Sequence, residues 1–183
     1  MKTLPFALCL SVLLSPACYA NQKIFLKLPD IDGESQTIPH VDEIEILAIS
    51  HNVINESSAT VGGGSGGAKS KFFDVRLVKF ADISSPKLLE LVATGENVSE
   101  AEITVRNFDD SEGAGGFAFY VITLSDVTVT SLASSVDASS GAVNETISLS
   151  FKTYELTYTP QANDGSAGAQ VGVCFDVAAN KVC

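Results

Sequence analysis

Hydrophobic residues along most of the chain recur at every second position, which is the pattern of strands with one buried face. Between Glu43 and Ile49, for example, Ile44, Ile46 and Ala48 alternate with other residues. The same alternation predicts further strands at 25–28, 73–80, 102–106, 117–123, 127–130, 147–151 and 154–158. The chain is therefore predicted to be mainly β.

One segment, residues 85–95, has the composition of a helix instead. Ser85 suits the N-cap, Pro86 suits the first turn and Gly95 suits the end of the helix. A single helix among about eight strands favours an antiparallel barrel or sandwich closed on itself, with the helix over an open end or edge. Polar and glycine-rich intervals predict loops at 55–70, 107–116, 134–144 and 160–170.

The beginning of the chain has a different pattern from the rest. Lys2 gives a positive start, residues 4–14 form an apolar run, and a small-x-small sequence ends at Ala20. These features predict a signal peptide over residues 1–20, cut between Ala20 and Asn21. The apolar run is shorter than the roughly 20 residues that span a bilayer, so we expect no membrane segment after cleavage. A lipoprotein signal with an acylated Cys18 is the alternative.

The remaining chain, 21–183, is long enough for one domain with a core and short for two, so we expect a single domain. The charge of the full sequence narrows the partners to expect, because 11 Lys and Arg stand against 22 Asp and Glu, for a net charge of −11, and the remaining chain, which lacks Lys2, is no less acidic. Such a charge repels phosphate backbones and anionic lipid. We therefore expect neither nucleic acid nor a membrane surface as a partner.

Cysteine usage indicates how the chain end is held. Of the 4 cysteines, only Cys174 and Cys183 lie outside the predicted signal peptide. An even number of cysteines in an oxidising compartment predicts a disulfide, which would contribute about 2 to 3 kcal/mol by closing a short loop. Two free thiols are the alternative, which spacing alone does not exclude.

Catalytic motifs do not rise above background. Gly63 to Gly67 contains a G-x-S-x-G pattern around Ser65, but His40 and His51 both precede the serine, whereas this chemistry places the histidine last in the chain. The same stretch lacks the last glycine and the following helix of a phosphate-binding loop. We therefore expect no enzyme activity, no catalytic residue and no cofactor.

Two groups of residues have the side chains of metal ligands without the spacing. His40 lies near Asp42 and Glu43, but no further ligand is spaced locally and His51 lies beyond an intervening strand. The acidic stretch 109–113 lacks the alternating spacing of a helical-hairpin calcium loop. A polar turn is favoured in both places, and no metal site is expected.

Several short motifs occur in an order that is similar to that of a known family. They lie at 24–27, 33–35, 40–47, 77–80, 85–89, 93–95, 124–127, 145–151 and 158–161. With the glycine-rich segment that follows the second of the predicted strands, they resemble the Hcp family, the haemolysin-coregulated tube proteins of type VI secretion. Residues 162–183 are similar to the ending of longer members, so we expect a C-terminal extension there.

The resemblance implies a closed β-barrel of two sheets with one flanking helix. It also implies that six copies form a ring with a wide lumen, that rings stack into a tube, and that effector proteins can occupy the lumen. The expected partners are therefore further copies of this chain and effector proteins. In the family a projecting loop touches the next ring, and here its candidate contact residues are Gly62, Gly63, Gly64, Ser65, Gly66, Gly67 and Lys69.

Two features depart from the family. Many members carry Trp-Ser-Trp-Gly where this chain has Ile49-Ser50-His51-Asn52, and the chain has no Trp. In addition, a signal peptide would send the chain to the periplasm or outside a Gram-negative cell, whereas tube subunits assemble in the cytoplasm. Two functions therefore remain open: a tube or exported structural component of type VI secretion, and an exported Hcp-like binding protein, locked by Cys174 and Cys183, that builds no tube.

Overall fold

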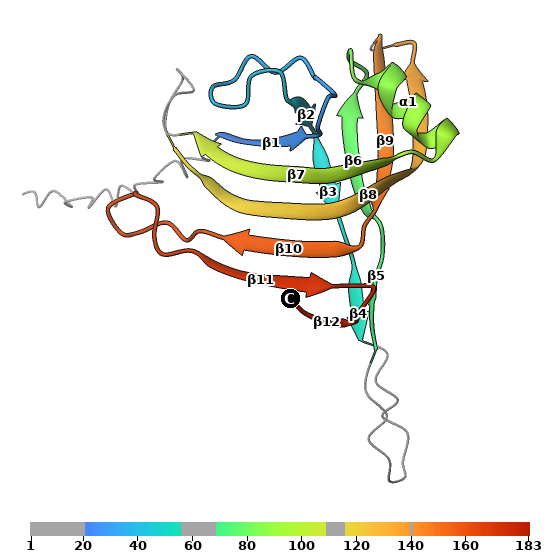
Figure 1. Cartoon of the computed structure of the whole chain (residues 1–183). Helices are drawn as coiled ribbons and strands as arrows, with labels where there is room; N and C mark the ends of the chain where they lie inside the picture. The colour runs from blue at the N-terminus through green and yellow to red at the C-terminus, as the bar shows by residue number, and fades with distance from the viewer. Residues whose placement is uncertain (1–20, 56–68, 109–115, 140) are drawn as a thin grey trace, which may run out of the picture.

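The computed structural model in Figure 1 describes residues 21–55, 69–108, 116–139 and 141–183. These residues form one helix and twelve strands in two sheets, so the prediction of a mainly β fold with one helix is confirmed. The elements are β1 Asn21–Lys27, β2 Ile44–Ile46, β3 Ala48–Ser50, β4 Val53–Asn55, β5 Ser70–Phe72, β6 Val75–Phe80, α1 Ser85–Thr94, β7 Asn97–Phe108, β8 Ala118–Asp137, β9 Ala142–Ser150, β10 Thr153–Tyr158, β11 Val171–Asp176 and β12 Lys181–Val182.

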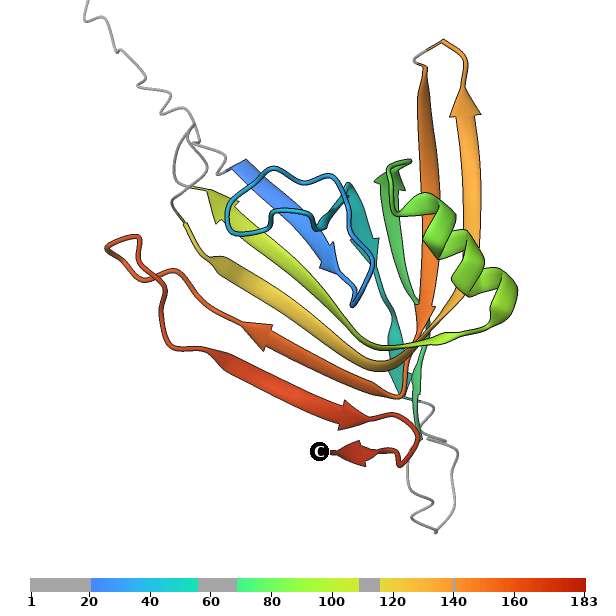
Figure 2. The same ribbon diagram turned by 45° about the horizontal axis from the view of Figure 1, so that its top comes forward.

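The larger sheet has ten strands and bends around the 20-residue strand β8 (Figures 1 and 2). The first part of β8 pairs with β7 and β10, and this long side of the sheet has the order β12-β11-β10-β8-β7-β1-β2. From Thr128 onward β8 pairs with β9, and the short side continues to β6 and β3. Strands β4 and β5 form the second sheet.

The hydrophobic core lies between the two sides of the larger sheet. Fully buried residues come from the long side, such as Ile103 and Ile122, and from the short side, such as Leu77 and Ile147, and all belong to one cluster. The alternation in the sequence explains this placement, because every second side chain of a strand points to the same face. Helix α1 adds Leu88 to the same core.

Strand boundaries differ from the sequence prediction where strands change partners. The predicted strand over 43–49 is two strands separated by Leu47, since β2 pairs with β1 and β3 pairs with β6. The predicted strand over 73–80 starts at Val75, and 117–123 and 127–130 are parts of the single strand β8. Much of the predicted loop at 134–144 is a hairpin between β8 and β9, because Val136 and Val143 still pair there.

Helix α1 confirms the predicted helix but corrects its first residue. Gly95 ends it with a φ of 70°, a conformation that glycine adopts without a steric penalty, and donates its N–H to Leu91 O at 2.9 Å. The N-cap residue is Ser84, not Ser85 as the sequence predicts. The Ser85 hydroxyl is occupied elsewhere, because it donates to Glu145 Oε2 at 2.7 Å.

Along the described residues α1 is the only helix, and it is too short to cross a bilayer.

Candidate functional site

A narrow two-stranded sheet projects from the body of the molecule, and we call β4 and β5 the arm (Figure 1). Val53 pairs with Phe72 at the base of the arm, and Asn55 pairs with Ser70 farther out. Apolar side chains on β4 are open to solvent, with Val53 43% and Ile54 37% exposed. The arm therefore presents apolar surface outside the core.

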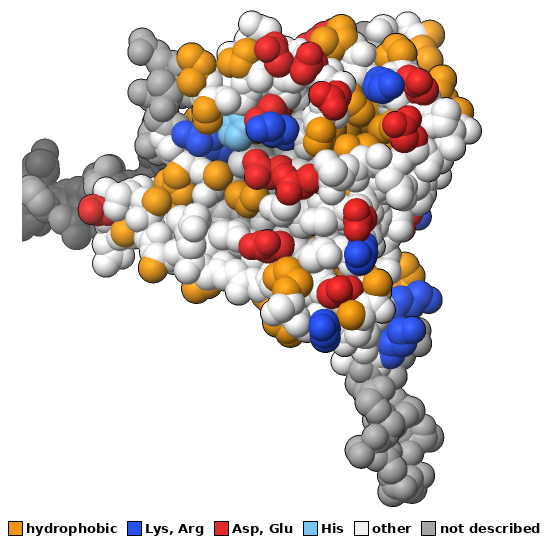
Figure 3. Space-filling view, viewed as in Figure 1, with side chains coloured by type: hydrophobic (Ala, Val, Ile, Leu, Met, Phe, Trp, Pro, Cys, Tyr) orange, Lys and Arg blue, Asp and Glu red, His pale blue; other side chains and the backbone are white. Residues whose placement is uncertain are grey.

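Most of the predicted ring-contact segment falls in the interval between β4 and β5 that the structure does not describe. Gly62, Gly63, Gly64, Ser65, Gly66 and Gly67 are outside the described residues, and with Ser65 so is the G-x-S-x-G pattern. Lys69, the remaining candidate contact residue, is described and exposed, and Lys71 on β5 is exposed as well. Figure 3 shows Lys and Arg side chains near the arm, and both acidic and basic side chains spread over the body.

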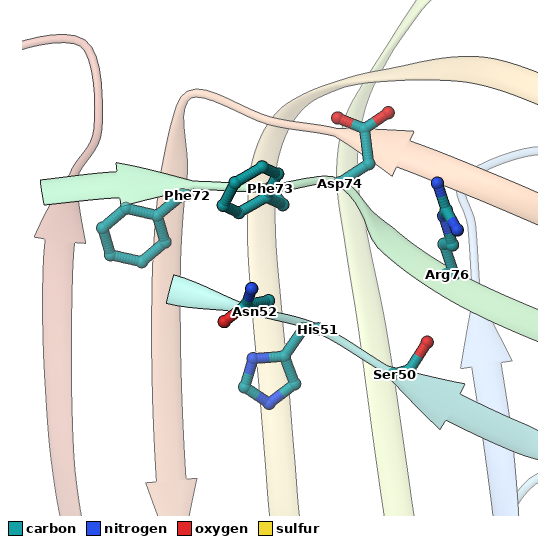
Figure 4. Close-up of a pocket in the computed structure, with 7 residues that line it drawn as sticks. All are labelled: Ser50, His51, Asn52, Phe72, Phe73, Asp74 and Arg76. Carbon is teal, nitrogen blue, oxygen red and sulfur yellow. The ribbon is translucent and has the colours of Figure 1, made fainter. Parts of the chain in front are cut away.

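A hollow of about 550 Å³ lies where the arm joins the body. Here β3 leads into β4 through His51 and Asn52, and β5 leads into β6 through Phe73 and Asp74. The two connections are linked by the Phe73 N–H, which donates to Asn52 O at 3.0 Å. The seven lining residues, drawn in Figure 4, are Ser50, His51, Asn52, Phe72, Phe73, Asp74 and Arg76.

His51, which the resemblance sets against the second Trp of Trp-Ser-Trp-Gly, directly follows β3. Its Nε2 lies 3.2 Å from the Tyr120 hydroxyl, and its ring centroid lies 5.6 Å from that of Tyr154. Burial, together with the neighbouring Tyr120, raises the pKa of the Tyr154 phenol, so this phenol stays neutral. The exposed His51 therefore makes one polar and one aromatic contact at this strand end, whereas Ile49 packs against the core.

The base of the arm packs on an aromatic cluster made of Phe72, Phe151, Tyr154 and Phe175. Phe72 is its centre, with its ring centroid 5.1 Å from Phe175, 5.7 Å from Tyr154 and 6.2 Å from Phe151. The Phe72 and Phe175 rings are stacked with an interplanar angle of 24°. Because Phe72 belongs to β5 and Phe175 to β11, the cluster joins the arm to the C-terminal part of the chain.

The C-terminal hairpin, residues 171–183, comprises β11 and β12 and extends the long side of the larger sheet beyond β10. Cys174 and Cys183 lie opposite each other across this hairpin as a disulfide, with their Cα atoms 5.4 Å apart. The Cys183 N–H donates to Cys174 O at 3.2 Å. The predicted cysteine pair is therefore at bonding distance, and it fastens the last strand to its neighbour.

A network of hydrogen bonds and ion pairs around Lys79 joins α1 to the sheet. The sequence analysis did not predict this network. The Lys79 side chain is fully buried, with its Nζ 2.8 Å from Asp82 Oδ1, 3.0 Å from Glu145 Oε2 and 3.1 Å from Ser85 Oγ. The signal was present in the alternation of β6, where Lys79 follows Val75 and Leu77 on the buried face. A lysine at a core position requires a charged partner.

The metal candidates of the sequence have other roles in the fold. His40 is buried, its Nδ1 lies 2.8 Å from Glu43 Oε2, and its ring stacks on Phe25 at 4.2 Å between centroids. No group of three His, Cys, Asp or Glu side chains that could hold a metal ion occurs in the described part of the chain. The acidic stretch 109–113 and Ala20 of the predicted cleavage site are outside the described residues, and Asn21 begins β1.

The side of the larger sheet that faces the core stays apolar on strands β10, β11 and β12, which continue past the core to the edge of the sheet. Leu156 of β10 pairs with the buried Ile122 of β8, so the side chains of β10 at every second position extend the core face outward. The continuation is open to solvent: the exposed fractions are 44% at Tyr158, 62% at Val171 and 52% at Val173. We call Tyr158, Val171, Val173 and Val182 (64% exposed) the apolar face.

Comparison with known proteins identifies the family. The sequence profile described as "Type VI secretion system effector, Hcp" matches residues 25–158. The chain is similar to the Protein hcp1 of Pseudomonas aeruginosa, with 30% identity over 143 residues that cover 78% of this chain and 86% of that protein.

Solved structures agree with this match. A type six secretion system protein superposes with a TM-score of 0.78 and 27% identity, over 89% of this chain and all of that chain. Hcp1 from Salmonella typhimurium gives a TM-score of 0.72 and 27% identity, over 88% of this chain and 99% of that chain. The profile, the sequence relative and the structures point to the same family, and the chain belongs to the Hcp proteins of type VI secretion.

Proposed function

We propose that this chain is a structural subunit of a type VI apparatus, six copies of which form a ring that stacks with other rings and carries effector proteins in its lumen. The observation that carries the proposal is the match to the Hcp family over residues 25–158, which include both sides of the larger sheet, the arm and α1. In this function the protein has no catalytic role. The single domain is expected to span 21–183, with 162–183 as the extension.

A closed barrel is part of this proposal. The pairings β1–β2, β3–β6, β6–β9, β9–β8, β8–β7 and β7–β1 follow one another, and Leu47 is the single residue between β2 and β3. The Leu47 N–H donates to Val78 O at 2.7 Å, so hydrogen bonding to β6 begins at that residue. These contacts support a sheet that closes on itself at Leu47. A barrel has no free edges along its wall, which suits a subunit that packs beside its neighbours in a ring.

The apolar face is proposed to be where one subunit contacts the next in a ring. Its valines and Tyr158 lie side by side on neighbouring strands and would be covered by a second copy. Val173→Asp places a charge in the middle of this face, and we expect it to convert rings to monomers in sedimentation velocity. Ala178→Asp places the same charge in the exposed turn of the hairpin and serves as the control, with rings retained. Rings that persist in Val173→Asp would overturn this assignment.

The arm is proposed to contact the next ring. It combines exposed apolar residues with the basic side chains Lys69 and Lys71, whereas the chain as a whole has a net charge of −11. Lys69→Glu/Lys71→Glu is expected to leave single rings intact and to shorten stacks seen by electron microscopy. Lys87→Glu, an exposed change on α1, is the control. Stacks of unchanged length in the double variant would contradict the role of the arm.

Export through the predicted signal peptide over 1–20, with the mature chain periplasmic or secreted, conflicts with assembly of a tube in the cytoplasm and therefore belongs to a second proposal. An exported Hcp-like binding protein that builds no tube is the second candidate, and the cysteine pair favours it because disulfides persist in oxidising compartments. Two masses of the protein from its host separate the two candidates: the intact mass of the chain and the native mass of its oligomer. A chain that starts at Asn21, is two hydrogens lighter and is monomeric supports the binding protein, whereas a ring of subunits supports the structural role.

A further inference from the structure

The arm and the C-terminal hairpin are joined at two points by different chemistry. Phe72 of β5 stacks on Phe175 of β11, with ring centroids 5.1 Å apart. Beyond this stack, the Ser70 N–H donates to Asn180 Oδ1 at 3.2 Å. Asn180 lies in the turn between β11 and β12, 110 positions from Ser70 in the sequence. The base of the arm therefore rests on the hairpin along both β11 and its turn.

The hairpin itself has little other than the disulfide to keep it closed. Strand β12 has two residues, and both are exposed. Two residue pairs connect it to β11, Phe175 with Val182 and Asp176 with Lys181. A two-residue strand at a sheet edge buries too little surface to persist by itself. The Cys174–Cys183 bond closes the hairpin at the end opposite to its turn.

The position of Asn180 depends on this closure. Its φ is 52°, in the left-handed region that asparagine tolerates in tight turns. The turn is held on one side by the Ala179 N–H, which donates to Asp176 Oδ1 at 2.7 Å, and on the other by β12. When β12 separates from β11, the turn loses one of its two supports, and the bond from Ser70 to Asn180 loses its fixed acceptor.

We propose that the Cys174–Cys183 bond is a redox-controlled brace, which holds the C-terminal hairpin against the base of the arm and so sets how rigidly the arm projects. Its effect on ring contact rests on the proposed function, whereas the coupling between disulfide and arm does not. Cys183 is exposed and Cys174 is half-buried, so thiol reagents reach the bond from solvent.

The chemistry of the switch is thiol–disulfide exchange. On reduction, an external dithiol supplies two electrons and two protons, the S–S bond breaks, two cysteine thiols form, and the dithiol becomes a disulfide. On oxidation, an external disulfide accepts the two electrons and two protons and is released as a dithiol. Reducing cytoplasm therefore favours the open hairpin, and an oxidising compartment favours the closed one. The arm would stiffen when the chain leaves the cytoplasm.

Amide hydrogen exchange of the mature chain, 21–183, tests the brace in the oxidised and dithiothreitol-reduced forms. We expect reduction to raise the exchange rates of the β5 amides, Ser70 and Lys71, by roughly 10-fold, because local opening becomes easier. Amides of β6 and β9 on the short side of the sheet are the internal control and should not change. The variant Cys174→Ser/Cys183→Ser should match the reduced form without any reductant.

Two further variants separate the brace from a general loosening. Asn180→Ala keeps the disulfide but removes the acceptor for Ser70, and we expect its β5 exchange to respond less to reduction than that of the parent chain. Asp164→Ala, which removes a side-chain acceptor from the Ser166 N–H in the loop before β11, should respond like the parent. Reduction that loosens residues 171–183 and leaves β5 unchanged would overturn the brace.

The same samples report on assembly separately. Sedimentation of the oxidised and reduced forms shows whether stacking changes with the state of the cysteines, and the brace predicts more stacks in the oxidised form. If β5 responds to reduction but neither form makes rings, the proposed function fails and the brace stands. If both forms make equal stacks while β5 responds, redox control of ring contact is overturned.

Discussion

Two peripheral pieces of this molecule, helix α1 and the C-terminal hairpin, are fastened to the same sheet in opposite ways. The helix is held from inside, where the fully buried Lys79 bridges Asp82, Glu145 and Ser85. The hairpin is held from outside, by edge pairing, one aromatic stack and a disulfide whose Cys183 is exposed. Solvent and dissolved reagents therefore contact the attachment of the hairpin, but not the buried Lys79 that attaches the helix.

The difference teaches which parts of the fold respond to the environment. A buried charged network is costly to disturb, because any change leaves an unpaired charge in a low-dielectric interior. An exposed disulfide is made or broken without unpacking the core. The part that holds the arm is thus adjustable, whereas the part that holds the helix is permanent. Variants at Lys79, at the cysteine pair and at Phe72 test this difference between the two attachments.

The largest effect is expected from Lys79→Met, which leaves the buried Glu145 and the partly buried Asp82 without their cation. We expect the free energy of unfolding to fall by about 3 to 5 kcal/mol in urea denaturation. Lys87→Met is the control, since Lys87 forms the exposed pair with Glu90 on α1, and it should leave stability almost unchanged. Lys79→Arg keeps the charge and should recover part of the loss. Equal stability of the Met and Arg variants would contradict the charged network.

A smaller loss is expected from Cys174→Ser/Cys183→Ser. Removing the cross-link frees a short loop in the unfolded chain, which lowers the free energy of unfolding by about 2 to 3 kcal/mol under oxidising conditions. Under reducing conditions the variant and the parent should unfold at the same urea concentration. A difference that survives full reduction would show that the serines act through packing and not through loss of the bond.

The smallest of the three effects is expected from Phe72→Ala at the centre of the aromatic cluster. Because Phe72 is only partly buried, we expect a loss of about 1 to 2 kcal/mol, concentrated in the arm. Phe73→Ala is the matched control, since the neighbouring Phe73 is 40% exposed and faces Lys71 instead of the cluster. Thermal unfolding of the two variants side by side checks the prediction, and equal losses would refute the role of the cluster.

The sequence predicts the parts of this fold that depend on local pattern. Alternation locates the strands that cover the core, and Gly95 marks the end of α1 because its φ of 70° favours glycine. The break at Leu47 was missed because Ala48 keeps the two-residue spacing of Ile44 and Ile46 in the sequence, although Ala48 is exposed once the strand changes partner at Leu47. β11 was missed although Val171, Val173 and Phe175 alternate with Gly172, Cys174 and Asp176 along it, and β12, with two residues, is too short to carry a pattern.

The candidate site was predictable only in part. The cysteine spacing suggested the pair that the structure brings together, but nothing near Cys174 indicates that Phe175 stacks on Phe72, about half the chain away. The local capping preference predicts Ser85 as the N-cap, but the Ser85 hydroxyl donates to the distant Glu145 instead. Contacts between distant residues therefore explain both the missed cluster and the misplaced cap.

The central claim, that this Hcp protein assembles into rings, is tested most directly by native mass spectrometry of the mature chain, with oxidised and reduced samples measured in parallel. The account predicts a species of six times the subunit mass in both samples, with stacked multiples of it enriched in the oxidised one. A monomer alone in both samples, at concentrations where a relative such as Hcp1 measured alongside forms larger species, would contradict it.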